Sequence, residues 1–190
     1  MREKIRDLLK DIWTIPNMLT ILRLVLVPVF AVLYSRGQYT AALIVFGTAS
    51  ITDLFDGYLA RKLNQITSFG KLMDPLADKA LVITALICHC AHGVFPLLPI
   101  ILMLVKEGAM VIGALLLLNR NIVVYANIYG KAATCVFLGS LVAGFFHEFW
   151  PANLGFALDV VLLWISVALS YVAGVSYAVH TWRQIAKPEK

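Results

Sequence analysis

Six long apolar runs constrain this chain more than any other feature of its sequence. Each run is long enough to cross a lipid bilayer as a helix, which takes about 20 residues. The runs occupy residues 17–34, 39–60, 71–91, 95–118, 127–146 and 155–180. Backbone groups cannot stay unpaired in lipid, so each run is expected to be helical. The sequence therefore predicts an all-α integral membrane bundle of six transmembrane helices.

Composition supports this fold class. The 190 residues are 61% hydrophobic and 14% charged, whereas ordinary globular domains have about 45–50% apolar and about 25% charged residues. A soluble fold of this length could not enclose so much apolar surface. We expect one six-helix domain over residues 15–182, followed by a cytoplasmic tail over 183–190.

Residues 1–14 have a different pattern. Apolar side chains recur at helical spacing, with basic residues between them. This pattern is typical of an amphipathic helix that rests on an anionic membrane surface. We therefore predict an N-terminal juxtamembrane helix over 1–14 that contacts anionic lipids; the alternative is a charged tail.

The distribution of basic residues predicts the orientation. Lys and Arg concentrate in cytoplasmic segments of membrane proteins. Here they cluster at both termini, around residues 61–71 and around 120–131, whereas the opposite side carries only Arg36. We expect a multi-pass protein of the cell (inner) membrane with both termini in the cytoplasm. The basic residues form no contiguous patch, which argues against nucleic-acid binding.

Four aspartates stand out within the apolar runs. Intramembrane ionisable residues are costly and usually functional. Asp53 and Asp56 are three residues apart, and Asp74 and Asp78 are four apart, so each pair shares one helical face. Four neighbouring carboxylates repel one another unless cations lie between them, and hard oxygen ligands favour Mg²⁺, Mn²⁺ or Ca²⁺. Two such metals can stabilise a displacement at phosphorus.

Other polar residues in the runs have more than one interpretation. Arg23 either snorkels to the interface or contacts a ligand. Lys106 either neutralises Glu107 or binds substrate, although adjacent helical residues do not face the same way. Asp159 suits a helix N-terminus. The segment 88–92 holds two cysteines and two histidines, but five consecutive residues do not converge as zinc ligands do, so a polar helix end is favoured.

Residues 53–78 read Asp-x2-Asp-Gly-x2-Ala-Arg-x8-Gly-x3-Asp-x3-Asp. This pattern resembles the signature of the CDP-alcohol phosphotransferase (CDP-alcohol phosphatidyltransferase) family at every fixed position. The segments Ile15-Pro16-Asn17-x2-Thr20-x2-Arg23 and 74–79 are similar to the phosphatidylglycerophosphate synthases and the CDP-alcohol-type cardiolipin synthases of that family.

The resemblance implies a homodimer of six-helix protomers with a polar cavity open to the cytoplasm. It implies that the four aspartates hold two divalent cations, Mg²⁺ or Mn²⁺, which grip the pyrophosphate of CDP-diacylglycerol. It assigns nucleotide binding to Asp53, Gly57, Ala60, Arg61 and Gly70. Asp78 doubles as the general base that takes the proton of the acceptor hydroxyl, and CMP leaves.

The acceptor alcohol is predicted less directly. Relatives that use glycerol 3-phosphate carry two Arg residues eight apart and then a Lys, where this chain has Lys106, Ala114 and Lys131. We assign Lys106, Lys131 and Arg23 to the acceptor phosphate. Transfer to glycerol 3-phosphate ranks first, and cardiolipin synthesis with phosphatidylglycerol as acceptor is the alternative. A cation transporter is a distant third, because the outer halves of the helices lack a matching acidic relay.

Overall fold

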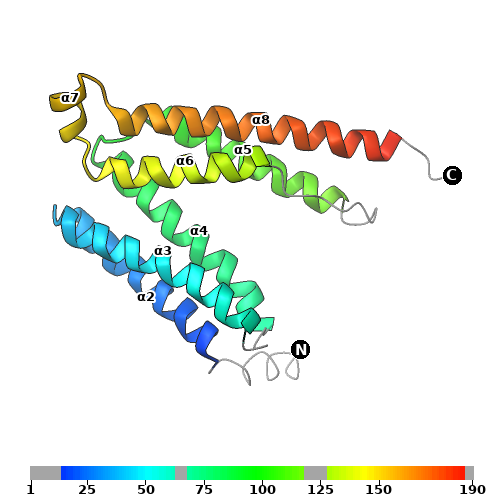
Figure 1. Ribbon diagram of the computed structural model, residues 1–190, viewed down its shortest axis with the longest axis horizontal. Helices are drawn as coiled ribbons and strands as arrows, with labels where there is room; N and C mark the ends of the chain where they lie inside the picture. Colours follow the sequence, from blue (N-terminus) through cyan, green and yellow to red (C-terminus); the bar gives the residue numbers. More distant parts are fainter. Residues whose placement is uncertain (1–13, 63–67, 118–127, 187–190) are drawn as a thin grey trace. The chain divides into compact units, whose positions relative to one another are not determined.

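The computed structural model describes residues 14–62, 68–117 and 128–186 (Figure 1). Within these ranges the regular secondary structure is entirely helical. The helices are α2 (Ile15–Ser35), α3 (Tyr39–Lys62), α4 (Ser68–Ala91), α5 (Leu97–Leu117), α6 (Ile128–Gly144), α7 (Phe149–Leu154) and α8 (Leu158–Ala186). The predicted amphipathic helix over 1–14 lies outside the described residues, apart from Thr14.

Each of the six predicted runs coincides with one long helix. The ends differ most at α8, which continues to Ala186 and so includes the first residues of the predicted tail. The short helix α7 was not predicted, because its six residues are too few to show a helical period. The all-helical fold class is therefore confirmed.

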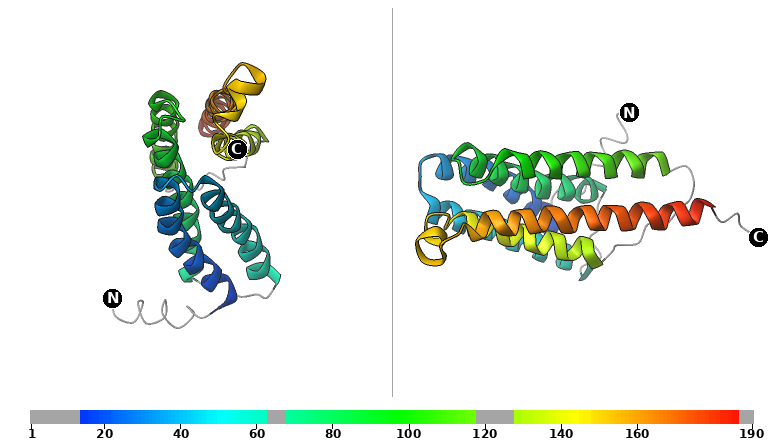
Figure 2. Two further views of the ribbon diagram at one scale, coloured as in Figure 1. Left: turned by 90° about the vertical axis from the view of Figure 1, so that its left-hand side faces the viewer. Right: turned by 90° about the horizontal axis from the view of Figure 1, so that it is seen from above.

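The chain divides into two compact units, Met1–Ala91 and His92–Lys190. In the first unit, α2 packs along both α3 and α4 (Figures 1 and 2). Aromatic rings fill the contact: Phe30 of α2 lies 5.9 Å from Phe46 of α3, and Tyr34 lies 5.0 Å from His89 of α4, measured between ring centroids. α2 is thus the central helix of this unit.

A tight turn joins α2 to α3. Gly37 adopts a left-handed φ of 72°, which glycine reaches without a steric penalty. The backbone N–H groups of Gly37 and Gln38 donate to the carbonyls of Tyr34 and Leu33, at 2.9 Å and 3.0 Å. These bonds satisfy carbonyls at the end of α2 and reverse the chain, so α3 returns beside α2.

In the second unit, α8 packs against α6 along most of the length of α6, and also against α5 and α7 (Figures 1 and 2). Both α6 and α8 carry small buried residues, among them Ser140, Ser166 and Ser170. Small side chains let helices approach closely. Four small residues recur every four positions on α8: Ser166, Ser170, Gly174 and Ala178. The first two are buried, so this row packs within the unit at its start.

Among the residues that the structure describes, two helical segments are long and apolar enough to cross a membrane: Asn17–Ser35 in α2 and Leu158–Val179 in α8. Tyr39–Thr52 and Ile128–Gly144 are apolar but shorter. The acidic motif interrupts the apolar sequence of α3 and α4. By length and composition alone, then, the structure supports two spans, and the six-span bundle stays a prediction.

Candidate active site

The first acidic pair lies in the last turns of α3. The backbone is helical through Lys62, so Asp53 and Asp56 occupy neighbouring positions on one face of the helix. The side chains from Asp53 to Arg61 lie outside the part of the chain whose side chains are described. Their predicted roles, including nucleotide binding by Gly57 and Ala60, stay predictions.

The second acidic pair lies in the first half of α4. Asp74 is partly buried and Asp78 is exposed, one helical turn further along. Ala77 between them is fully buried, and Gly70 near the start of the helix is buried as well. The carboxylate of Asp78 is thus accessible to a ligand, whereas that of Asp74 lies closer to the packed interior.

Asp74 is held from the neighbouring helix. The hydroxyl of Thr20 on α2 donates a hydrogen bond to Oδ1 of Asp74, and the two oxygens lie 2.5 Å apart. Thr20 itself is fully buried. The second acidic pair is therefore tied directly to α2.

Thr20 belongs to a row of buried polar residues on α2. Asn17, Thr20 and Arg23 recur every three residues and are each at most 1% exposed. The sequence interpretation used Asn17 and Thr20 only for the family resemblance and did not assign them to the site. The signal that could have identified them is polar residues at helical spacing inside an apolar run.

Arg23 lies level with the second acidic pair. Two contacts relate α2 to α4: Thr20 with Asp74, and Tyr34 with His89. The difference in residue number is nearly the same for both contacts, so the two helices run parallel. Because both helices rise about 1.5 Å per residue, Arg23 falls at the height of Asp78. Its complete burial disfavours the snorkelling interpretation, which requires the guanidinium at the interface.

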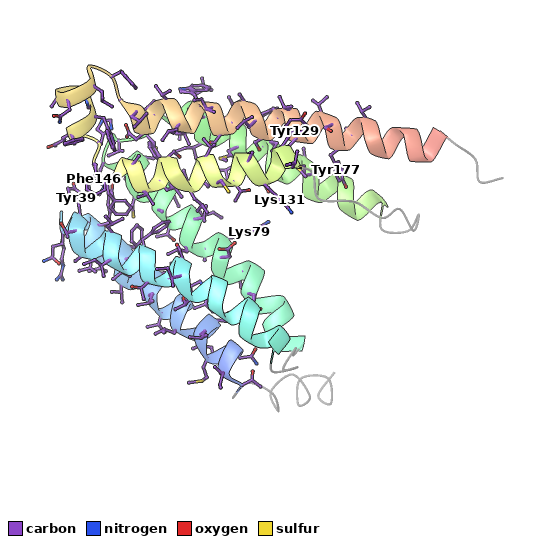
Figure 3. The ribbon with its side chains drawn as sticks, in the orientation of Figure 1. Tyr39, Lys79, Tyr129, Lys131, Phe146 and Tyr177 are labelled. Carbon is purple, nitrogen blue, oxygen red and sulfur yellow. The ribbon has the colours of Figure 1, made fainter. Side chains whose placement is uncertain are left out.

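The second unit gathers two of the predicted phosphate-binding cations at one height. On α5, Cε of Lys106 lies 4.0 Å from the position that a Cβ on Gly174 of α8 would take. On α6, a Cβ placed on Gly130 would lie 4.0 Å from Cβ of Ala173, the residue before Gly174. Lys131 follows Gly130 and is exposed. Figure 3 shows Lys131, Tyr129 and Tyr177 toward the same end of the α6–α8 pair.

Lys106 forms an ion pair with its neighbour in sequence. Its Nζ lies 2.7 Å from Oε1 of Glu107, and the Lys106 side chain is 13% exposed, against 51% for Glu107. Cε of Lys106 lies close to Gly174 of α8, and the length of the lysine side chain lets its Nζ reach the carboxylate of the adjacent residue. Lys106 and Glu107 thus form an ion pair, but Glu107 is half exposed, so the pair is not a buried one. A substrate role for Lys106 stays a prediction.

The segment 88–92 does not form a metal site among the described residues. His89 is fully buried, with Nδ1 2.8 Å from the carbonyl oxygen of Ala85 and its ring against Tyr34. Cys88 is buried and Cys90 is partly buried. The structure supports the interpretation of this segment as a helix end and gives His89 a packing role.

Asp159 lies in the first turn of α8, as the sequence predicted for an acid that suits a helix N-terminus. It also has a second interaction that was not predicted. Oδ2 of its fully buried carboxylate lies 2.7 Å from Nδ1 of His147. This pair ties the segment before α7 to α8 and has no part in the acidic motif.

The donor set of the first unit fits a divalent cation in its chemistry. Among the residues whose side chains are described, no three metal-ligating side chains form a group that could hold a metal, but Asp53 and Asp56 fall outside that set. Asp74 offers a carboxylate whose Oδ1 is oriented by a neutral donor, and Asp78 offers an exposed one. Such oxygen ligands suit Mg²⁺ or Mn²⁺.

The model of one protein family, CDP-alcohol phosphatidyltransferase, matches residues 13–172. This chain belongs to that family. The match covers all four aspartates, Lys106 and Lys131, and the whole buried polar row of α2. Membership of a family that handles lipid substrates, together with the two apolar spans, indicates a membrane enzyme that transfers phosphatidyl groups.

Several curated relatives are similar over most of their length. The CDP-diacylglycerol–glycerol-3-phosphate 3-phosphatidyltransferase of Bacillus subtilis is 32% identical over 188 residues, covering 91% of this chain and 97% of the relative. A probable phosphatidylglycerophosphate synthase of Mycobacterium tuberculosis is 38% identical over 175 residues, covering 89% and 82%. An Aquifex aeolicus protein named like the first is 31% identical, covering 91% and 98%.

Proposed function

We propose that this protein is a phosphatidylglycerophosphate synthase, which transfers the phosphatidyl group of CDP-diacylglycerol to glycerol 3-phosphate and releases CMP. The observation that carries the proposal is full-length similarity to relatives named for this reaction, in a chain that keeps the complete acidic motif on α3 and α4. The family match argues against the transporter alternative.

We assign the metal site to Asp53, Asp56, Asp74 and Asp78, with two divalent cations, Mg²⁺ or Mn²⁺. When bound, such ions neutralise the pyrophosphate of the donor and stabilise charge at the reacting phosphorus. The chain's own contribution is to bring four carboxylates onto two adjoining helices and to orient Asp74 from α2. Asp53, Gly57, Ala60, Arg61 and Gly70 bind the cytidine nucleotide, where the missing side chains of the glycines leave room for the ligand.

Asp78 acts as the general base. Its exposed carboxylate accepts the proton of the acceptor hydroxyl as that oxygen attacks the phosphorus bearing diacylglycerol. The new phosphorus–oxygen bond forms as the bond to CMP breaks, and CMP departs with the electron pair. Positioning and charge stabilisation account for most of the rate in reactions of this type.

Lys106, Lys131 and Arg23 serve the acceptor phosphate. The common height of Lys106 and Lys131 beside α8 supports this assignment. One observation favours phosphatidylglycerol as the acceptor instead, which would make the enzyme a cardiolipin synthase. Glu107 already pairs with Lys106, so the net charge available to a dianionic phosphate is reduced.

The membrane arrangement completes the proposal. Six spans between residues 15 and 182 place both termini and the aspartates at the cytoplasmic side of the cell membrane. Large apolar side chains are exposed on every long helix, among them Val25, Ile44, Ile87, Val105 and Val175, which suits contact with lipid or with a second protomer of a homodimer.

The decisive experiment supplies purified protein with CDP-diacylglycerol and either glycerol 3-phosphate or phosphatidylglycerol. We expect Mg²⁺-dependent CMP release and phosphatidylglycerophosphate with the first acceptor, and loss of both on chelation with EDTA. Cardiolipin formed only with the second acceptor would transfer the assignment to the alternative. Turnover that persists after complete chelation would contradict the metal site.

A further inference from the structure

The hydrogen bond from Thr20 to Asp74 is unusual among the described hydroxyl contacts. Ser35, Thr48 and Thr134 each donate to the carbonyl four residues earlier in their own helix, at 2.8, 2.8 and 3.0 Å. A hydroxyl has one proton to donate, and bonding to the local backbone is its usual use in a helix. Thr20 instead donates to a carboxylate 54 residues away in sequence.

We propose that Thr20 is a positioning residue for the metal site, holding the carboxylate of Asp74 in the orientation that a divalent cation requires. The inference rests on the proposed function only in taking Asp74 as a metal ligand. Thr20 touches neither substrate nor cation; it acts through Oδ1 of Asp74.

The chemistry of the donor supports this role. A neutral hydroxyl fixes one oxygen of the carboxylate without cancelling its negative charge. A lysine or arginine in its place would compete with the cation for the same oxygens. With Oδ1 held by Thr20, Oδ2 and the remaining lone pair of Oδ1 stay available as ligands. Ligating carboxylates are commonly oriented in this way by a hydrogen bond from a neighbouring group.

The location of Thr20 also favours positioning. Its side chain is fully buried where α2 packs along α4, so its hydroxyl cannot swing toward bulk solvent. Asn17 and Arg23, on the same face, are buried too. The rotamer of Thr20 is thus restricted by packing and by its branched side chain, which makes it a rigid reference for the carboxylate.

The test compares Thr20→Val with Thr20→Ser in the purified full-length protein. Valine keeps the shape of threonine and removes the donor, whereas serine keeps the donor. Mn²⁺ binding is measured by electron paramagnetic resonance in the absence of nucleotide. We expect Thr20→Val to bind Mn²⁺ about 10–100-fold more weakly and Thr20→Ser to remain near the unmodified protein.

Thr48→Val is the matched control, because it makes the same substitution at an exposed threonine that bonds only to Ile44 in its own helix. It should leave Mn²⁺ binding unchanged. In turnover assays, Thr20→Val should raise the Mg²⁺ concentration needed for half-maximal rate, and excess Mg²⁺ should restore much of the activity. A merely structural role would instead lower the unfolding temperature without changing Mn²⁺ affinity.

Equal Mn²⁺ affinity in Thr20→Val and the unmodified protein would overturn the proposal, as would equally weak binding by Thr20→Ser. Thr20→Ala, read by the same criterion, replaces Thr20→Val if the valine variant does not fold. Absence of Mn²⁺ binding by the unmodified protein would overturn the site and this inference together. Normal Mn²⁺ binding without any lipid product would refute the proposed function while leaving the role of Thr20 intact.

Discussion

Buried hydroxyl groups serve different purposes in the two units. In the second unit, the hydroxyls of Ser140 and Ser166 donate to carbonyls three residues earlier in their own helices, each at 2.7 Å. In the first unit, Thr20 is equally buried, but its hydroxyl bonds a carboxylate on another helix. The two serines contribute small size, which lets helices pack closely. Thr20 contributes a hydrogen bond to a carboxylate of the acidic motif.

The acids of the two units differ in the same way. Asp159 in the second unit is fully buried and paired with His147, which ties two segments together. Asp78 in the first unit is exposed and lies one turn from Asp74. A carboxylate that is already buried and paired has little to offer a ligand. Asp159 therefore has a structural role in the second unit, whereas the role of Asp78 at the reacting phosphorus stays a prediction.

The sharpest way to break this comparison is to neutralise one acid in each unit. Asp78→Asn should reduce CMP release by about 10²–10⁴-fold or more, because it removes the proposed general base. Asp56→Asn should also abolish most of the CMP release, because it removes a proposed metal ligand; both variants should stay folded. Asp159→Asn is the matched control and should retain most of the turnover. Substantial turnover in Asp78→Asn would refute its assigned role, and a dead Asp159→Asn would refute the purely structural role of Asp159.

A smaller effect is expected on stability in the second unit. Ser166→Leu places a large side chain at a fully buried position of α8 and should destabilise the protein by about 1–3 kcal/mol, the cost of overpacking. Ser166→Ala, which loses only a bond within its own helix, should change stability by less than about 1 kcal/mol. Thermal unfolding in detergent measures both variants. A neutral Ser166→Leu would show that the small residue is not required for packing.

The smallest expected effect concerns the acceptor. Ala114→Arg adds, on α5, the second cation that relatives using glycerol 3-phosphate carry eight residues after the position of Lys106. It should lower the KM for glycerol 3-phosphate by about 3–10-fold, since charged hydrogen bonds contribute roughly 1.5–3 kcal/mol and part is offset by solvent. Ala114→Leu serves as the size control. An unchanged KM would argue against this placement of the acceptor phosphate.

The helices and the chemistry of the motif were predictable from the sequence. Long apolar runs favour helices wherever they occur in lipid, and helical spacing decides which residues share a face. For this reason the bounds of α2 and α3 agree with prediction to within two residues. The acidic pairs also follow from spacing alone, because repulsion between carboxylates requires a cation whatever the fold.

Only the tertiary structure decided which residues meet across helices. Thr20 and Asp74 are 54 residues apart, and no period within either helix relates them. The pair of His147 with Asp159 and the approach of Lys106 to Gly174 depend on how the helices pack. The sequence determined the helices and the types of ligand, since those depend on local spacing and charge. The residues that meet across helices depend on the register between the helices, which is set by the close packing of side chains.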